Sequence, residues 1–155
     1  MNFSAKEDIE APIDFVFEQI TDFPAFERSA LRRGAEVQRM DNLKTAGPGM
    51  KWDATFTYRG REREVKLELL SMDRPNGIVV GSRSNMMGGQ LVVDLVALSR
   101  GCTRMSVDLE ITPKSLSARL LIQSLKLAKS KLNERFRKRV ANHAAEIEER
   151  YKWQG

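Results

Sequence analysis

The sequence predicts an α+β fold in which a curved antiparallel sheet of about seven strands surrounds a long C-terminal helix, with two short helices after the first strand. Two observations carry this prediction. Over residues 50–111, segments of alternating apolar and polar side chains are separated by turn residues, which is typical of an antiparallel meander. From residue 116 to about residue 151, apolar side chains recur at spacings of three or four without any Gly or Pro, which indicates one amphipathic helix.

Size and composition favour one ordinary globular domain that covers residues 1–155. Apolar residues make up 41% and charged residues 30% of the chain, and no apolar run is long enough to span a bilayer. The N-terminal residues lack the apolar segment of a signal peptide, so a cytoplasmic protein is expected. The single Cys102 excludes an internal disulfide, and one Cys with one His argues against a zinc site. We therefore expect neither a metal nor a cofactor.

The first elements are a strand and two short helices. Residues 2–10 alternate between apolar and polar side chains, which predicts a strand, and Pro12 suits the first turn of the helix that follows. Asp22 is a suitable N-cap for a second helix, which accepts Pro24 in its first turn and ends at Gly34. The apolar positions of the first helix are Ile13, Phe17 and Ile20.

The middle of the chain reads as successive strands. The stretch "DNLKTAGPGM" is a loop by composition, and "RPNG" at 74–77, "MMGG" at 86–89 and "SRG" at 99–101 are turn signals. The turns recur about every dozen residues, which predicts hairpins rather than crossovers. The predicted strands cover residues 35–40, 50–59, 64–69, 78–84, 91–98 and 104–111.

The C-terminal helix is predicted over Leu116 to about Tyr151. One helix cannot fill the concavity of a strongly curved sheet, so we expect an apolar cavity between them. The two short helices would then close one end of this cavity with Phe17, Phe23 and Phe26. The apolar stripe of the long helix contains Leu121, Leu125, Ala128, Leu132, Phe136, Val140, Ala144 and Ile147.

The segment "IEAPIDFVFEQITDFPAF" at residues 9–26, followed by the meander and the terminal helix, resembles the START/Bet v 1-like superfamily with its helix-grip fold. Within it, the chain is most similar to the polyketide cyclase/dehydrase and lipid-transport group, and the resemblance covers nearly the whole chain. It implies binding of a hydrophobic small molecule in the cavity, and some members catalyse cyclisation or dehydration there. The superfamily has no shared catalytic motif, so no catalytic residue is assigned.

The candidate ligand-binding residues lie on the expected inner faces of the sheet and helices. Trp52, Phe56 and Tyr58 form an aromatic stripe that fits either an ordinary sheet core or a cavity wall. If Tyr58 is buried, its hydroxyl needs a partner, which a ligand or water would supply. The full set is Phe23, Phe26, Trp52, Phe56, Tyr58, Leu67, Leu69, Leu91, Val93, Met105, Val107, Leu121, Leu125 and Leu132.

Other chemically active side chains give weaker signals. His143 lies beside the apolar stripe of the terminal helix, and we interpret it as a partly exposed helix residue. Cys102 falls beside a turn and reads as a surface thiol. Glu7 is the one acid in phase with the apolar side of the first strand, which makes it a weak candidate for acid–base chemistry.

The chain has a formal net charge of +5, and its cations concentrate on the terminal helix. A basic run on a helix is usually a solvated face, but a basic amphipathic helix also suits an anionic membrane surface. The pattern argues against nucleic acid as a partner, because no aromatic side chains for base stacking are interleaved with these cations. Residues 91–98 are apolar on both faces, which is consistent with a homodimer contact. The cations are Lys126, Lys129, Lys131, Arg135 and Lys138.

The sequence therefore favours a protein that binds or transports a lipid, a quinone or a polyketide-like molecule, because an apolar cavity is expected and no catalytic set is evident. One alternative is a cofactor-free cyclase or dehydrase. The other is a regulatory module that acts through the basic face of the terminal helix.

Overall fold

Seven strands form one antiparallel sheet with the order β1-β7-β6-β5-β4-β3-β2 in this computed structural model, which describes residues 1–154. The strands are β1 (Asn2–Ile9), β2 (Glu36–Arg39), β3 (Lys51–Tyr58), β4 (Arg61–Asp73), β5 (Gly77–Arg83), β6 (Met87–Ser99) and β7 (Cys102–Pro113). The helices are α1 (Ile13–Ile20), α2 (Phe23–Arg32), α3 (Leu116–Lys126) and α4 (Lys129–Lys152). The predicted α+β architecture is confirmed.

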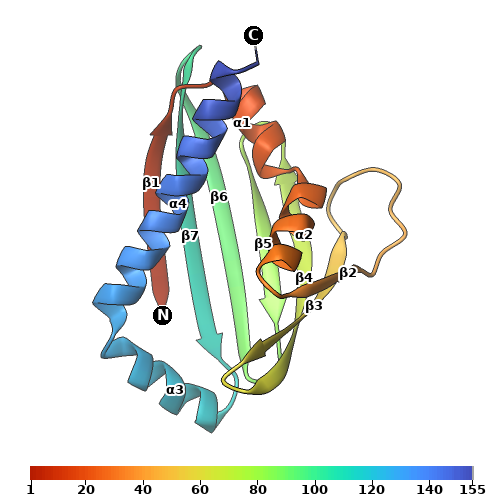
Figure 1. Ribbon diagram of the computed structural model, residues 1–155, viewed down its shortest axis with the longest axis vertical. Coiled ribbons are helices and arrows are strands. Elements are labelled where there is room, and N and C mark those ends of the chain that lie inside the picture. Colours follow the sequence, from red (N-terminus) through yellow and green to blue (C-terminus); the bar gives the residue numbers. More distant parts are fainter. Residues whose placement is uncertain (155) are drawn as a thin grey trace.

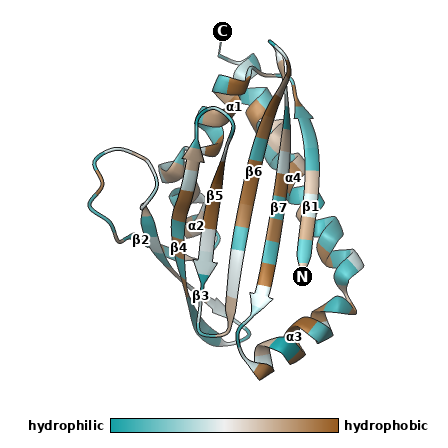
Figure 2. Ribbon diagram, turned by 180° about the vertical axis from the view of Figure 1, so that it is seen from behind, coloured by the Kyte–Doolittle hydropathy of each residue, from teal (hydrophilic) through white to brown (hydrophobic). Residues whose placement is uncertain are grey.

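The helices α1, α2 and α4 lie on one face of the curved sheet, which we call the inner face (Figure 1). The first strand, β1, pairs with the last strand, β7, along its full length, with Phe3 opposite Leu109 and Ile9 opposite Thr103. The remaining strands follow one another as hairpins, as the spacing of turn signals predicts. Figure 2, seen from behind, shows apolar residues along β4, β5 and β6 in the middle of the sheet.

The two short helices begin and end where the sequence predicts. The Asp22 carboxylate accepts a hydrogen bond from the backbone N–H of Ala25 at 3.2 Å, which caps α2. At the other end of α2, Arg33 is the C-cap and Gly34 follows it. Gly34 has φ +92°, a left-handed conformation that glycine adopts without strain. The apolar side of α1 is buried through Val16, Phe17 and Ile20.

The prediction of a single terminal helix from Leu116 is wrong in one respect, because the structure divides this segment into α3 and α4. Around the break, the backbone N–H groups of Leu127 and Ala128 bond to carbonyls three residues earlier, and Ala128 leaves the helical region with φ −105° and ψ 16°. The break lets α3 bend around the end of the sheet while both helices keep an apolar side against it. Ala128, expected in the buried stripe, is exposed at this corner.

The core gathers at one end of the inner face. Toward the β6–β7 turn, the inner side chains of the sheet pack against α1 and α4 and are almost fully buried. There the buried hydroxyl of Thr103 donates to the carbonyl of Ala11 at 2.8 Å, which ties β7 to the start of α1. We call this the closed end. The opposite end, where α3 and the β3–β4 and β5–β6 turns lie, we call the open end (Figure 1).

Candidate ligand-binding surface

The inner face of the sheet becomes more accessible from the closed end to the open end. Along β7, Thr103 and Met105 are buried, whereas Leu109 is only partly buried. The same gradient runs along β3, from the buried Met50 to the exposed Tyr58. The partly buried apolar side chains form what we call the open inner face, which comprises Phe56, Val65, Leu67, Val80, Leu91, Leu109 and Ile111.

Strand register brings these apolar side chains together across five strands. Leu91 of β6 lies opposite both Val80 of β5 and Leu109 of β7. Phe56 and Val65, from β3 and β4, extend the surface beyond the end of β5. The result is a partly buried apolar surface at the open end of the sheet, where α3 contacts β7.

The sequence-predicted ligand-binding residues fall into three groups. Six are buried in the core, six are half-buried and two are exposed. The core holds Phe23, Trp52, Leu69, Val93, Met105 and Val107; the half-buried group is Phe56, Leu67, Leu91, Leu121, Leu125 and Leu132; the exposed pair is Phe26 and Tyr58.

Trp52 illustrates the core group. Its ring stacks at 5.4 Å from the ring of Phe23, and its indole N–H donates to the Glu27 carboxylate at 2.8 Å. The guanidinium of Arg39 lies 5.9 Å from the same ring. These contacts fix Trp52 between β3 and α2, so its indole nitrogen is already satisfied without a ligand.

Arg63 is a polar residue of the inner face that the sequence reasoning missed. It follows the same alternation as Val65 and Leu67 on β4, which places it on the inner side at the open end. Its Nε is buried without a hydrogen-bond partner among the described residues, and its Nη1 contacts only the sulfur of Met86 at 3.9 Å. Thioether sulfur is a weak acceptor, so this guanidinium retains unused donor capacity.

His143 of α4 packs against α2, with its ring 5.6 Å from the ring of Phe26. Its Nε2 is buried and has no hydrogen-bond partner among the described residues. Burial lowers the pKa of His143. The Glu146 carboxylate, 4.0 Å from His143 Nδ1, opposes this effect, whereas the positive charge of Arg150 adds to it. The imidazole is therefore neutral at pH 7.

We expect the free energy of unfolding to fall as the pH is lowered below 6.5, the ordinary pKa of histidine. The unfolded chain binds this proton more readily than the folded chain, so the stabilisation is complete above 6.5 and declines as the pH falls toward the folded-state pKa. Asp8 and Asp41 titrate below this range, because Arg104 and Arg39 lower their pKa values. Urea unfolding at several pH values would show the decline, and H143Q should reduce it. An unchanged pH dependence in H143Q would contradict the assignment.

Glu7 lies in the middle of β1, opposite Met105. It borders a pocket of about 420 Å³ at the edge of the sheet, together with Arg137 of α4. The pocket walls are polar or charged apart from Ala5. Glu7 therefore borders a polar pocket at the sheet edge rather than an apolar chamber.

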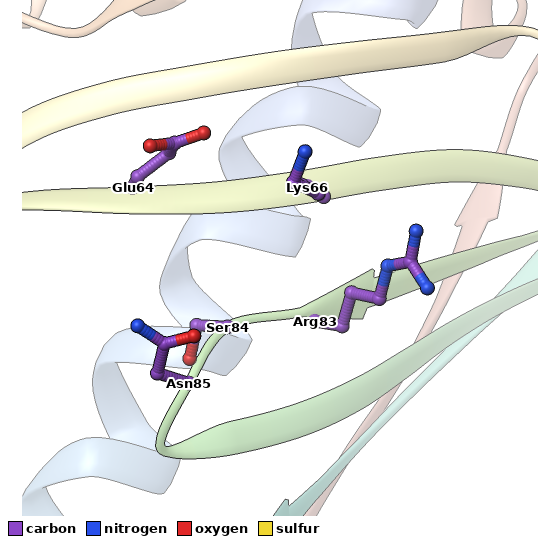
Figure 3. A pocket seen from close by; sticks show the side chains of 5 residues that line it. All are labelled: Glu64, Lys66, Arg83, Ser84 and Asn85. Atoms are coloured by element: carbon purple, nitrogen blue, oxygen red, sulfur yellow. The ribbon is translucent and has the colours of Figure 1, made fainter.

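Other pockets lie on the outer face of the sheet. One of about 280 Å³ is lined by Glu64, Lys66, Arg83, Ser84 and Asn85, and α4 lies behind the sheet in this view (Figure 3). A neighbouring pocket of about 530 Å³ is lined mainly by outward-facing residues of β3, β4 and β5. Charges of both signs line these pockets, and Lys66 pairs with Asp53 at 3.9 Å, so they suit an apolar ligand less than the open inner face does.

Several solved structures share this fold. The chain is similar to the Zhui aromatase/cyclase from Streptomyces sp. R1128, with a TM-score of 0.69 and 11% identity over 100% of this chain and 98% of that chain. For a START superfamily protein from Mycobacterium smegmatis, the TM-score is 0.56 with 12% identity over 86% and 95% of the two chains. For Ara h 8.0201, the TM-score is 0.59 with 13% identity over 92% of this chain and 98% of that chain.

No family model and no curated protein matches the sequence. The structural likeness confirms the START/Bet v 1-like, helix-grip fold, and at these identities it establishes the fold alone. No helix among residues 1–154 is long and apolar enough to cross a membrane.

Proposed function

We propose that the protein binds an amphipathic small molecule, with the apolar part on the open inner face and an anionic or carbonyl oxygen at Arg63. The observation that carries this proposal is the gradient of burial along the inner face, which leaves apolar side chains accessible beside α3. Lipids, quinones and polyketide-like molecules all have this division between an apolar body and oxygen atoms. The structural likeness to an aromatase/cyclase and to a START superfamily protein supports the same class of ligand.

The open inner face leaves apolar side chains exposed to water, which is unfavourable. Proteins rarely leave a contiguous apolar surface open unless something binds there. On the open inner face, Leu91, Val80 and Leu109 lie on three adjacent strands, while the half-buried Leu121 and Leu125 of α3 supply further apolar area at this end. An apolar molecule on this surface would release its own hydrating water and that of the protein.

Arg63 provides a hydrogen-bond donor for the polar end of the ligand. A buried guanidinium N–H without an acceptor is unfavourable, and a ligand oxygen would remove that penalty. A negatively charged oxygen would form the stronger bond. The ligand is therefore expected to carry a carboxylate, phosphate, enolate or carbonyl oxygen at the end nearest the β3–β4 turn.

The test measures binding of the fluorescent polyene fatty acid cis-parinaric acid and of its methyl ester. We expect the wild type to bind both, and R63Q to bind the acid about tenfold more weakly because a charge-assisted hydrogen bond is lost. The ester should bind R63Q and the wild type almost equally. L91E should weaken both probes, whereas V96E, on the outer face of the same strand, should weaken neither.

Circular dichroism spectra and urea unfolding would confirm that L91E and V96E are folded before their binding is compared. Absence of probe binding to the wild type would overturn the proposal. Equal loss in L91E and V96E would show that the probe does not bind the inner face. Native mass spectrometry of freshly purified protein, followed by organic extraction, would identify a bound molecule directly.

A second candidate is a cofactor-free cyclase or dehydrase, and His143 favours it. Its neutral imidazole has a buried Nε2 without a partner, which suits a general base acting on an acidic carbon between carbonyls. H143Q should then retain probe binding but no longer convert a poly-β-keto thioester. Chromatography and mass spectrometry would measure this conversion. Absence of conversion by the wild type would remove this candidate.

A further inference from the structure

The helix α3 is apolar on both sides. Ala118 and Ile122 face the body of the protein and are buried. On the opposite side, Leu116, Leu120 and Leu127 are 75%, 59% and 91% exposed. At 100° per residue, the three leucines lie within about 40° of each other around the helix axis, since Leu127 keeps a helical backbone conformation. We call them the leucine stripe.

The surroundings of the leucine stripe are positively charged. Between Glu110 and Glu134 the sequence contains no acid, although it contains several cations. Arg119 and Lys126 lie on one flank of the stripe by helical spacing, and Ser117 and Ser124 lie on the other. The cations of this segment are Lys114, Arg119, Lys126, Lys129 and Lys131.

We propose that α3 docks on an anionic lipid bilayer, with the leucine stripe in the boundary between headgroups and acyl chains and the flanking cations at the headgroups. A helix with this pattern lies in the plane of the interface rather than across it. Figure 1 shows α3 projecting at the open end of the molecule, where its outer side can meet a flat surface without interference from the sheet. Figure 2 shows apolar positions along α3 at this end of the molecule.

Charge selects a bilayer over a second copy of the chain. In a two-fold contact between leucine stripes, α3 would face its own copy, so Arg119 and Lys126 would find no acid on that helix and would meet its cations in an antiparallel pair. Like charges placed together oppose association. Anionic headgroups provide the opposite charge along the whole helix, and each Lys or Arg near such a surface adds to binding.

The break before α4 supports this assignment. It places Leu127 at the corner between the two helices, where the side chain is almost fully exposed and stays in line with Leu116 and Leu120. The open inner face lies at the same end of the molecule as α3 (Figure 1). Docking would therefore bring a ligand-binding surface next to the membrane, although the docking itself does not depend on the proposed ligand.

The test is cosedimentation with vesicles of phosphatidylcholine, with or without phosphatidylserine. We expect binding only when phosphatidylserine is present, and a decline with rising salt. K126Q/K129Q should weaken binding about 25-fold, on the basis of about fivefold per cation. L116S/L127S should weaken it at least about tenfold, because two exposed leucines no longer enter the lipid.

Two control variants carry the same changes elsewhere. R100Q/K152Q removes two exposed cations at the closed end, and L31S/L98S removes two exposed leucines from α2 and β6. Both controls should bind vesicles as the wild type does. Because all four variants change exposed side chains, their unfolding transitions should match that of the wild type.

Several outcomes would overturn the proposal. They are absence of vesicle binding, equal binding with and without phosphatidylserine, and undiminished binding by L116S/L127S. A dimer in sedimentation equilibrium that L116S/L127S abolishes would show that a second copy covers the leucine stripe instead. Vesicle binding by a protein that takes up neither parinaric probe would support docking and reject the proposed ligand site, so the two proposals fail separately.

Discussion

F17A is expected to lower the free energy of unfolding by about 3–5 kcal/mol, as truncation of a large core aromatic does. Phe17 has no exposed surface and is the largest fully buried side chain, and it holds α1 in the core at the closed end. The guanidinium of Arg74 lies 4.8 Å from its ring centroid and would lose this contact as well. Urea unfolding followed by circular dichroism would measure the change.

The control is F26A in the next helix. Phe26 is 43% exposed and packs against His143 at the surface between α2 and α4, so its truncation should cost about 1 kcal/mol or less. A cost for F17A as small as that for F26A would show that Phe17 lines an empty chamber rather than a packed core. The comparison therefore decides between the cavity wall that the sequence suggests for Phe17 and the core that the structure shows.

The order of elements could be predicted because each one has a local signal. Asp22 caps α2 and Gly34 follows its end, and both requirements are visible in a short window of sequence. The strands alternate because one side faces the helices, and the turn residues set their limits. The break between α3 and α4 has no such signal, since neither Gly nor Pro is present there. It depends on where the sheet ends beneath the helix, which is a property of the assembled fold.

The candidate site could be predicted only in part. Alternation assigns Trp52 and Phe56 to the same face of β3, yet Trp52 is in the core and Phe56 is on the open inner face. Their difference depends on how far α1 and α2 extend over the sheet, which no local pattern states. Arg63 could have been found, because it is in phase with Val65 and Leu67. A cation at the start of a strand is usually solvated, so the pattern alone did not distinguish it.

G77A is expected to destabilise the protein by about 3 kcal/mol, at the upper end of the usual cost of overpacking. A Cβ on Gly77 would clash with the carbonyl oxygen of Val93 and lie 3.3 Å from the Cα of Asp94. Both are backbone atoms of β6, so no side-chain rotation can relieve the contact. The β5–β6 pair would have to separate where Gly77 lies opposite Asp94, next to the buried Ile78 and Val93. Thermal or urea unfolding would measure the loss.

Two other glycines make this prediction specific to the backbone contact. In G81A the new Cβ would meet Leu70 Cδ1 at 2.9 Å, but this exposed side chain can turn away, so the cost should stay below about 1 kcal/mol. In G101A nothing lies within 4 Å, and the change should be smaller still. The expected order of destabilisation is G77A, then G81A, then G101A. If G77A unfolds like G101A, the close approach of β5 and β6 is wrong, and with it the alignment of Val80 with Leu91 on which the open inner face depends.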